Sequence, residues 1–225
     1  MRRPSFAILS ASLNTATVWL FGDILMASVL LTAFEPYESW AANASWLCLQ
    51  ELTRELPREP AITTRLYPVQ FDAARERLRR DLEANYDFAL HLGQSPGSTR
   101  IRLEAMAINV RGEPCPTTQD FRPLAEDGPA AFRTTLPLAA WAATLREAGI
   151  PAAVSYHAGT FLCNATLYWS HYLAERMSLR TRAAFMHVPL DTSQTLLDAP
   201  DRPSMNASIT AAGLRLILQE LVAMA

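Results

Sequence analysis

The chain has 225 residues, half of them hydrophobic, which is enough for one domain with a sizeable core. It contains no lysine, so its twenty basic residues are all arginines, and its formal net charge is −2. The arginines are scattered apart from a group at 75–80 that is typical of the solvated face of a helix, which argues against a nucleic-acid-binding protein.

The cysteine content points to a reducing compartment. Three cysteines occur, at Cys48, Cys115 and Cys163, and no two of them have the spacing of metal ligands. An odd number of cysteines without such spacing argues against both a disulfide framework and a zinc site. We therefore expect a cytoplasmic protein without a bound metal.

The first 25 residues differ from the rest of the chain. A basic start, Met1-Arg2-Arg3, and a mildly apolar stretch at 6–9 resemble a weak signal peptide, but polar residues interrupt the stretch. No apolar run approaches the roughly 18 residues of a membrane span, so we expect no membrane association. We interpret 1–25 as an over-extended gene start or an extension, with export as the alternative, and 26–225 as a single domain.

From Met26 onward, strand-like and helix-like segments alternate. The expected strands are 29–32, 63–69, 88–92, 101–110, 152–156 and 183–188. The expected helices are 42–56, 71–84, 138–148, 164–177 and a last one from about 208. This alternation predicts an α/β fold, a three-layer α/β/α sandwich with a mostly parallel, mixed central sheet. A polar, proline-containing run at 111–128 predicts a long surface loop.

Cys163 has the most favourable position for chemistry. It follows the strand expected at 152–156 and lies at the start of the next helix. Unpaired N–H groups and the helix dipole at that end stabilise a thiolate relative to a thiol. In sheets of this kind, functional side chains also gather at the carboxyl ends of strands. The sequence therefore indicates Cys163 as a nucleophile.

A catalytic cysteine needs a histidine as its base. His187 closes the strand expected at 183–188, one βα unit beyond the cysteine, and His157 at the end of the preceding strand is the alternative. His171 lies eight residues into the helix, more than about 10 Å away at about 1.5 Å per residue. His91 lies within an apolar strand, where a core role is expected.

Glu104 is the only acidic residue of the run 101–108. Two interpretations remain open from the residues alone. One is a solvent-facing position in a half-buried strand, and the other is a carboxylate that orients a catalytic histidine.

Six motifs follow one another along the chain, namely Thr32 to Tyr37 with Asn43 and Ser45, Gly93-Gln94 with Glu104 and 107–109, Thr135 to Pro137, Ala158 to Asn164, His187-Val188-Pro189 and Pro203 to Met205. In this order they resemble the motifs of one enzyme family, the pyroglutamyl peptidases (pyrrolidone-carboxylate peptidases), which are cysteine peptidases. The histidine follows the cysteine by the family's customary interval of 24 residues. The resemblance spans the chain from Val29 to its C-terminal end.

The resemblance implies an activity and a set of residues. It implies a triad of Cys163, His187 and Glu104 that hydrolyses an N-terminal pyroglutamyl residue from a peptide, without a metal or organic cofactor. It also implies a homodimer or homotetramer. The residues implied as substrate contacts are Phe34 and Tyr37, which would sandwich the flat lactam ring, together with Gln94, Phe161 and Leu162. Aromatic packing on a loop is the alternative for Phe34 and Tyr37.

The chain departs from the family pattern, which makes it a divergent member. Glu38 and Ser39 occupy positions where the family commonly has glycine, and Ser98 and Ala105 replace two frequent arginines. Tyr37 stands in place of a phenylalanine. These changes leave two other functions open, which are a cysteine amidohydrolase of the same fold acting on another N-capped amide and a non-catalytic protein that binds capped peptides.

Overall fold

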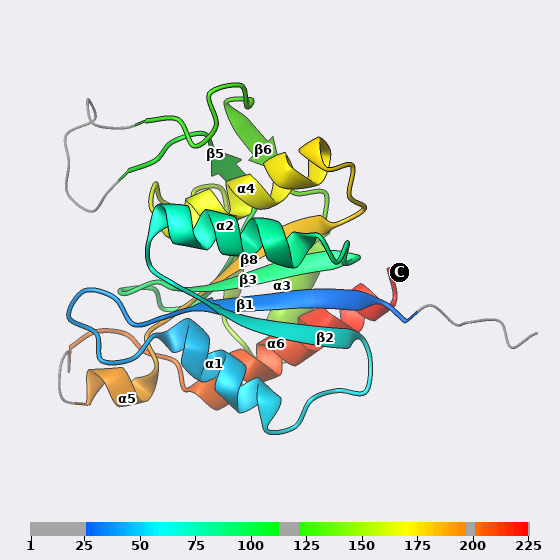
Figure 1. Cartoon of the computed structure of the whole chain (residues 1–225). Helices are drawn as coiled ribbons and strands as arrows, with labels where there is room; N and C mark the ends of the chain where they lie inside the picture. Colours follow the sequence, from blue (N-terminus) through cyan, green and yellow to red (C-terminus); the bar gives the residue numbers. More distant parts are fainter. Residues whose placement is uncertain (1–25, 113–121, 197–200, 225) are drawn as a thin grey trace, which may run out of the picture.

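The computed structural model describes residues 26–112, 122–196 and 201–224, and it shows a six-stranded sheet between two layers of helices (Figure 1). The strand order is β2-β1-β3-β8-β4-β7. The strands are β1 Ser28–Phe34, β2 Ala61–Tyr67, β3 Phe88–Gln94, β4 Ile101–Glu104, β7 Ala152–Ser155 and β8 Arg182–Val188. Only the β4–β8 pairing is antiparallel, so the sheet is mixed and mostly parallel, as predicted.

Two groups of helices cover the sheet (Figure 1). One face carries α1 Ala44–Thr53, α3 Leu138–Glu147 and α6 Ala207–Val222, and the other carries α2 Phe71–Leu82 and α4 Leu162–Arg176. Apolar residues at intervals of three or four give α2 one buried face, which is the pattern of an amphipathic helix. Each layer thus closes its own hydrophobic cluster against the sheet. None of the helices described is long and apolar enough to cross a membrane.

The strand expected at 101–110 is broken at Ala105. Its first part is β4, and its second part, β5 Met106–Ile108, pairs with β6 Ala131–Arg133 in a separate two-stranded sheet. The N–H of Ala105 still donates to β7, whereas its carbonyl accepts from the segment that follows β6. The chain therefore changes sheets at this residue, directly after Glu104.

Two short elements were absent from the expectations, namely β6 and the single-turn helix α5 Thr192–Thr195. Both are too short for periodicity to reveal. Residues 1–25, the middle of the loop expected at 111–128, and Cys115 lie outside the described residues.

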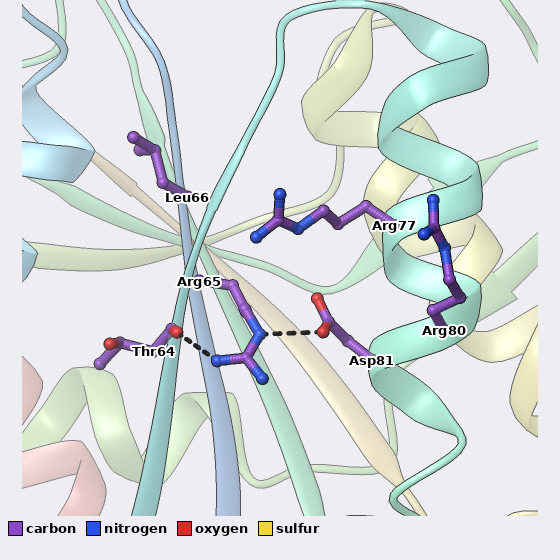
Figure 2. A pocket seen from close by; sticks show the side chains of 6 residues that line it. All are labelled: Thr64, Arg65, Leu66, Arg77, Arg80 and Asp81. Carbon is purple, nitrogen blue, oxygen red and sulfur yellow. Dashed lines mark hydrogen bonds and ion pairs between the residues drawn. The ribbon is translucent and has the colours of Figure 1, made fainter.

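A groove of about 500 Å³ lies between β2 and α2 (Figure 2). In it, Arg65 Nε donates to Asp81 at 2.9 Å and Arg65 Nη1 donates to the carbonyl of Thr64 at 2.9 Å. The groove is lined by Thr64, Arg65, Leu66, Arg77, Arg80 and Asp81. It lies on the outer strand of the sheet and contains none of the predicted site residues.

Candidate active site

The side chains of His187 and Glu104 meet on one face of the sheet. His187 lies near the end of β8, and Glu104 ends the antiparallel strand β4. His187 Nδ1 is 2.7 Å from Glu104 Oε1, and the two side chains are 5% and 0% exposed. A hydrogen bond from Nδ1–H to the carboxylate fixes the ring and leaves Nε2 for the nucleophile. The structure therefore brings together the predicted base and the predicted orienter.

Cys163 is the second residue of α4, whose N-cap is Phe161. A Cβ atom placed on Gly93 of β3 would lie only 2.9 Å from Cys163 Sγ, so the thiol packs directly against this glycine. The register of β3 and β8 pairs Gly93 with His187. Gly93 thus leaves the space in which the sulfur lies next to the imidazole.

The electrostatics of His187 reflect both partners. Burial by itself lowers the pKa of His187, because the imidazolium loses its contact with water. The negative charge of Cys163 and a hydrogen bond with it act in the opposite direction, as does Glu104, and together they raise the pKa from 6.5 to about 9. At neutral pH, His187 is therefore an imidazolium between a sulfur and a carboxylate.

The other three histidines have different surroundings. His157, the alternative base, is exposed, and its Nδ1 accepts a hydrogen bond from the N–H of Gly159 at 2.9 Å. The ring of His91 is fully buried between two hydroxyl groups, and burial lowers its pKa to about 3. Burial also lowers the pKa of His171 to about 4. His91 is thus the core residue that the sequence indicated.

Tyr37 lies near the nucleophile. Burial, followed by the negative charge of Cys163, raises the pKa of the Tyr37 hydroxyl to about 12. The Gln94 amide also lies near this hydroxyl and acts to lower its pKa. The predicted pocket residues Tyr37 and Gln94 are therefore grouped around Cys163.

The amide of Gln94 is held on one side only. Its Oε1 accepts from the N–H of Ala44 and from Gln194 Nε2, both at 2.8 Å. Its Nε2 is buried, lies near the Tyr37 hydroxyl and makes no hydrogen bond of good geometry among the described residues. A fixed amide with an unused donor is suited to a ligand that carries a carbonyl oxygen.

Of the other three predicted pocket residues, two are buried and one is partly exposed. Phe34 is 3% exposed, and its ring centroid lies 6.4 Å from that of Phe185. Leu162 is 2% exposed and belongs to the same hydrophobic cluster. Phe161 is partly exposed and meets Phe71 edge-on at 5.2 Å. The aromatic packing considered for Phe34 is thus observed, and its neighbour Phe185 in turn lies 4.8 Å, between ring centroids, from His187.

A family model described as pyroglutamyl peptidase matches residues 27–223. The chain belongs to the pyroglutamyl peptidase family. It is 35% identical to the pyrrolidone-carboxylate peptidase of Clavibacter michiganensis, over 88% of this chain and 94% of that protein. It is 37% identical to the enzyme of the same name from Thermococcus kodakarensis, over 85% and 94%.

Solved structures agree with this assignment. The pyrrolidone carboxyl peptidase of Fervidobacterium islandicum superposes with a TM-score of 0.81 at 32% identity, covering 87% of this chain and 98% of that one. Pyroglutamyl peptidase I of Bacillus amyloliquefaciens gives 0.79 at 29% identity, covering 88% and 95%. The family predicted from the motifs and the α/β fold predicted from the alternation of strands and helices are therefore confirmed, and the chain is a hydrolase of the cysteine peptidase class.

The turn after Tyr37 shows how this pyroglutamyl peptidase accommodates its missing glycine. The N–H of Trp40 donates to the carbonyl of Tyr37 at 3.2 Å, and Glu38 between them has a φ of +52°. This left-handed conformation costs a side-chain-bearing residue about 1–2 kcal/mol and suits glycine. The backbone that glycine favours is thus present at position 38 despite the glutamate.

Sequence reasoning missed two residues that support the site. Asn164 accepts from the N–H of Ile108 and donates to the carbonyls of Ile108 and Val110, which ties the segment after Glu104 to the start of α4. The motif containing Asn164 was recognised, but its contacts depend on the fold. Gln194 lies on the short helix α5, whose local sequence signal is the capping box that Asp191 and Gln194 form, and its contact with Gln94 depends on the fold.

Proposed function

We propose that this protein hydrolyses the amide bond after an N-terminal pyroglutamyl residue of peptides or proteins, with Cys163 as nucleophile, His187 as acid and base, and Glu104 as orienter. The family assignment supports the reaction. The observation that supports the residue roles is the buried 2.7 Å contact of His187 with Glu104, together with the charge of Cys163 acting on the same imidazole.

In the first half of the reaction, the Cys163 thiolate attacks the pyroglutamyl carbonyl carbon. The tetrahedral intermediate collapses when His187 donates its proton to the leaving amine, which leaves a thioester on the sulfur. The hydrogen bonds of α4 begin with the N–H of Ala165, which donates to the carbonyl of Phe161. Cys163 lies in the first turn before this bond, so its N–H has no acceptor within the helix. That group is suited to hold the oxyanion.

In the second half, neutral His187 takes a proton from water, and the resulting hydroxide attacks the thioester carbon. Pyroglutamate leaves, and the thiolate–imidazolium pair is restored. Throughout both halves, the Glu104 carboxylate holds one tautomer of the ring and stabilises its charged form. Each group needed for the cycle thus comes from the chain itself.

The pocket residues have a matching role in this proposal. A pyroglutamyl residue has no free α-amine, and its ring is a flat, neutral lactam. Gln94 Nε2, buried without a hydrogen bond of good geometry among the described residues, would donate to a lactam oxygen, while Tyr37 and Phe34 would contact the ring faces and Phe161 and Leu162 its edge. We expect Tyr37→Ala to raise KM, whereas Tyr37→Phe, which keeps the ring, should leave it nearly unchanged.

The test of this function compares pyroglutamyl and free-amino peptides of the same downstream sequence. Cleavage confined to the pyroglutamyl peptide supports the proposal, and cleavage of only the free-amino peptide would refute it. A protein that merely binds capped peptides would instead keep its biological activity when Cys163 is replaced by alanine. The Cys163→Ala variant should lose turnover and keep its fold.

We further propose that the peptidase works in the cytoplasm as a homodimer or homotetramer. The family resemblance supports the oligomer, and a catalytic thiol that must stay reduced supports the compartment. Light scattering coupled to size-exclusion chromatography tests the first point, and turnover with and without a reductant tests the dependence on a free thiol.

A further inference from the structure

The Glu104 carboxylate is buried with few partners. Its side chain is fully shielded from solvent, Oε1 meets His187, and Oε2 has no hydrogen-bond partner among the described residues. A buried carboxylate is strongly destabilised unless opposite charges lie close to it. One permanent cation does lie close, because Arg102 Nε is 3.6 Å from Glu104 Oε1.

The register of the sheet explains why these three groups converge. Arg102 and Glu104 are two residues apart on β4, so their side chains lie on the same face. On the antiparallel neighbour β8, His187 is directly opposite Arg102. Glu104 therefore lies diagonal to His187 on a shared face, within the range of cross-strand contact.

The guanidinium of Arg102 is also held from the other side. Its Nη2 donates to Ser95 Oγ at 3.0 Å, and the N–H of Ser95 donates to the carbonyl of Val188 at 2.8 Å. Arg102 Nε is buried and makes no hydrogen bond. The Arg102 side chain thus lies between the Glu104 carboxylate and Ser95, the first residue after β3.

We propose that Arg102 is a positioning residue that holds the buried Glu104 carboxylate against His187 and compensates its charge while His187 gains and loses its proton. The inference rests on the proposed function. When His187 gives its proton to the leaving amine, the imidazole becomes neutral, and Arg102 is then the charge that still compensates the buried carboxylate. Two charged groups of the described residues contact Glu104, namely His187 of β8 and Arg102 of the same strand. Its neighbour on β7, Ser155, is uncharged. Cys163 acts on Glu104 through His187.

The first experiment needs no substrate. The rate at which iodoacetamide alkylates Cys163 reports the fraction of thiolate, and mass spectrometry of the peptide that contains Cys163 separates it from the other cysteines. Cys48 stays silent because burial raises its pKa to about 12. The alkylation rate falls on the acidic side of this pH profile, where the thiolate is protonated, and we call this part the acidic limb. In the Arg102→Met variant, we expect the midpoint of the acidic limb to move to higher pH by about half a unit or more. Arg102→Lys should restore most of the shift, and Arg100→Met, at an exposed arginine of the same segment, should cause none.

The second experiment measures turnover of a pyroglutamyl conjugate by the same variants. Arg102→Met should lower kcat about tenfold or more with KM within about twofold, since Arg102 acts through the triad and not on the substrate. An unchanged or lowered acidic limb, or a lysine variant as impaired as the methionine variant, would overturn the role. If the wild type does not cleave pyroglutamyl substrates at all, the proposed function fails, and the alkylation profile still decides the role of Arg102.

Discussion

Replacing Cys163 with alanine should lower the pKa of His187 by more than one unit. The rise of this pKa from 6.5 to about 9 corresponds to about 3 kcal/mol of net preference for the imidazolium. Burial opposes this preference, so the charged partners must supply more than the net value. Cys163 is the larger contributor and Glu104 the smaller. Without the sulfur, only Glu104 remains to offset burial, and we expect the preference for the imidazolium to fall by more than about 1 kcal/mol.

The assay is an NMR titration of the His187 ring between pH 5 and 10. The pKa is raised in the folded protein, so the imidazolium persists at neutral pH and is lost as the pH rises through about 9. We expect the pKa to fall in the order wild type, Glu104→Gln, Cys163→Ala. His91 and His171, with pKa values of about 3 and 4, should remain neutral over the whole range and act as internal controls.

Two results would show that Cys163 is not the main partner of the imidazolium. One is a His187 pKa in Cys163→Ala within half a unit of the wild-type value, which would mean that the sulfur does not stabilise the imidazolium. The other is a larger decrease in Glu104→Gln than in Cys163→Ala, which would reverse the order of the two partners.

Three further predictions concern activity and stability. The kcat/KM of the wild type should decline above a pH of about 9, where His187 loses the proton that it donates to the leaving amine, and a decline centred below pH 7 would contradict this. Gly93→Ala should lower kcat by on the order of 100-fold, because the new Cβ would lie 2.9 Å from Cys163 Sγ and 2.6 Å from the ring of Phe185. Wild-type kinetics in that variant would show that the thiol lies elsewhere. Asn164→Ala should lower the free energy of unfolding by about 2–3 kcal/mol in urea titrations, since it leaves three partly buried backbone groups unpaired, whereas a loss below about 0.5 kcal/mol would argue against its contacts.

Much of the fold could be predicted from the sequence, because local patterns carry that information. The alternation of apolar strands with amphipathic helices gave the three layers, and the strand-to-helix position of Cys163 and the strand-end position of His187 needed no tertiary knowledge. Because each of the two residues lies at or just after the carboxyl end of a strand, both were expected at the same edge of the sheet. Their contact depends on tertiary structure, because the register of β3 and β8 places Gly93 beside His187 and Cys163 Sγ packs against this glycine.

The rest depended on tertiary geometry. Nothing local indicates that β4 runs antiparallel to β8, so the residues alone could not decide whether Glu104 faces solvent or His187. The break at Ala105 arises because the chain pairs there with two different sheets, which periodicity cannot reveal. The contact of Arg102 with Glu104 has the same origin, because a surface arginine and a charged partner two residues away also fit a solvated strand.

The central claim is that Cys163 cleaves the bond after pyroglutamate. Release of a fluorogenic amine from a pyroglutamyl conjugate, measured for the wild type and for Cys163→Ser, tests it most directly. We expect steady release by the wild type in the presence of a reductant, and a loss of at least about 1,000-fold in kcat/KM for a serine variant that folds normally. Equal release by both proteins, or none by a folded and reduced wild type, would contradict it.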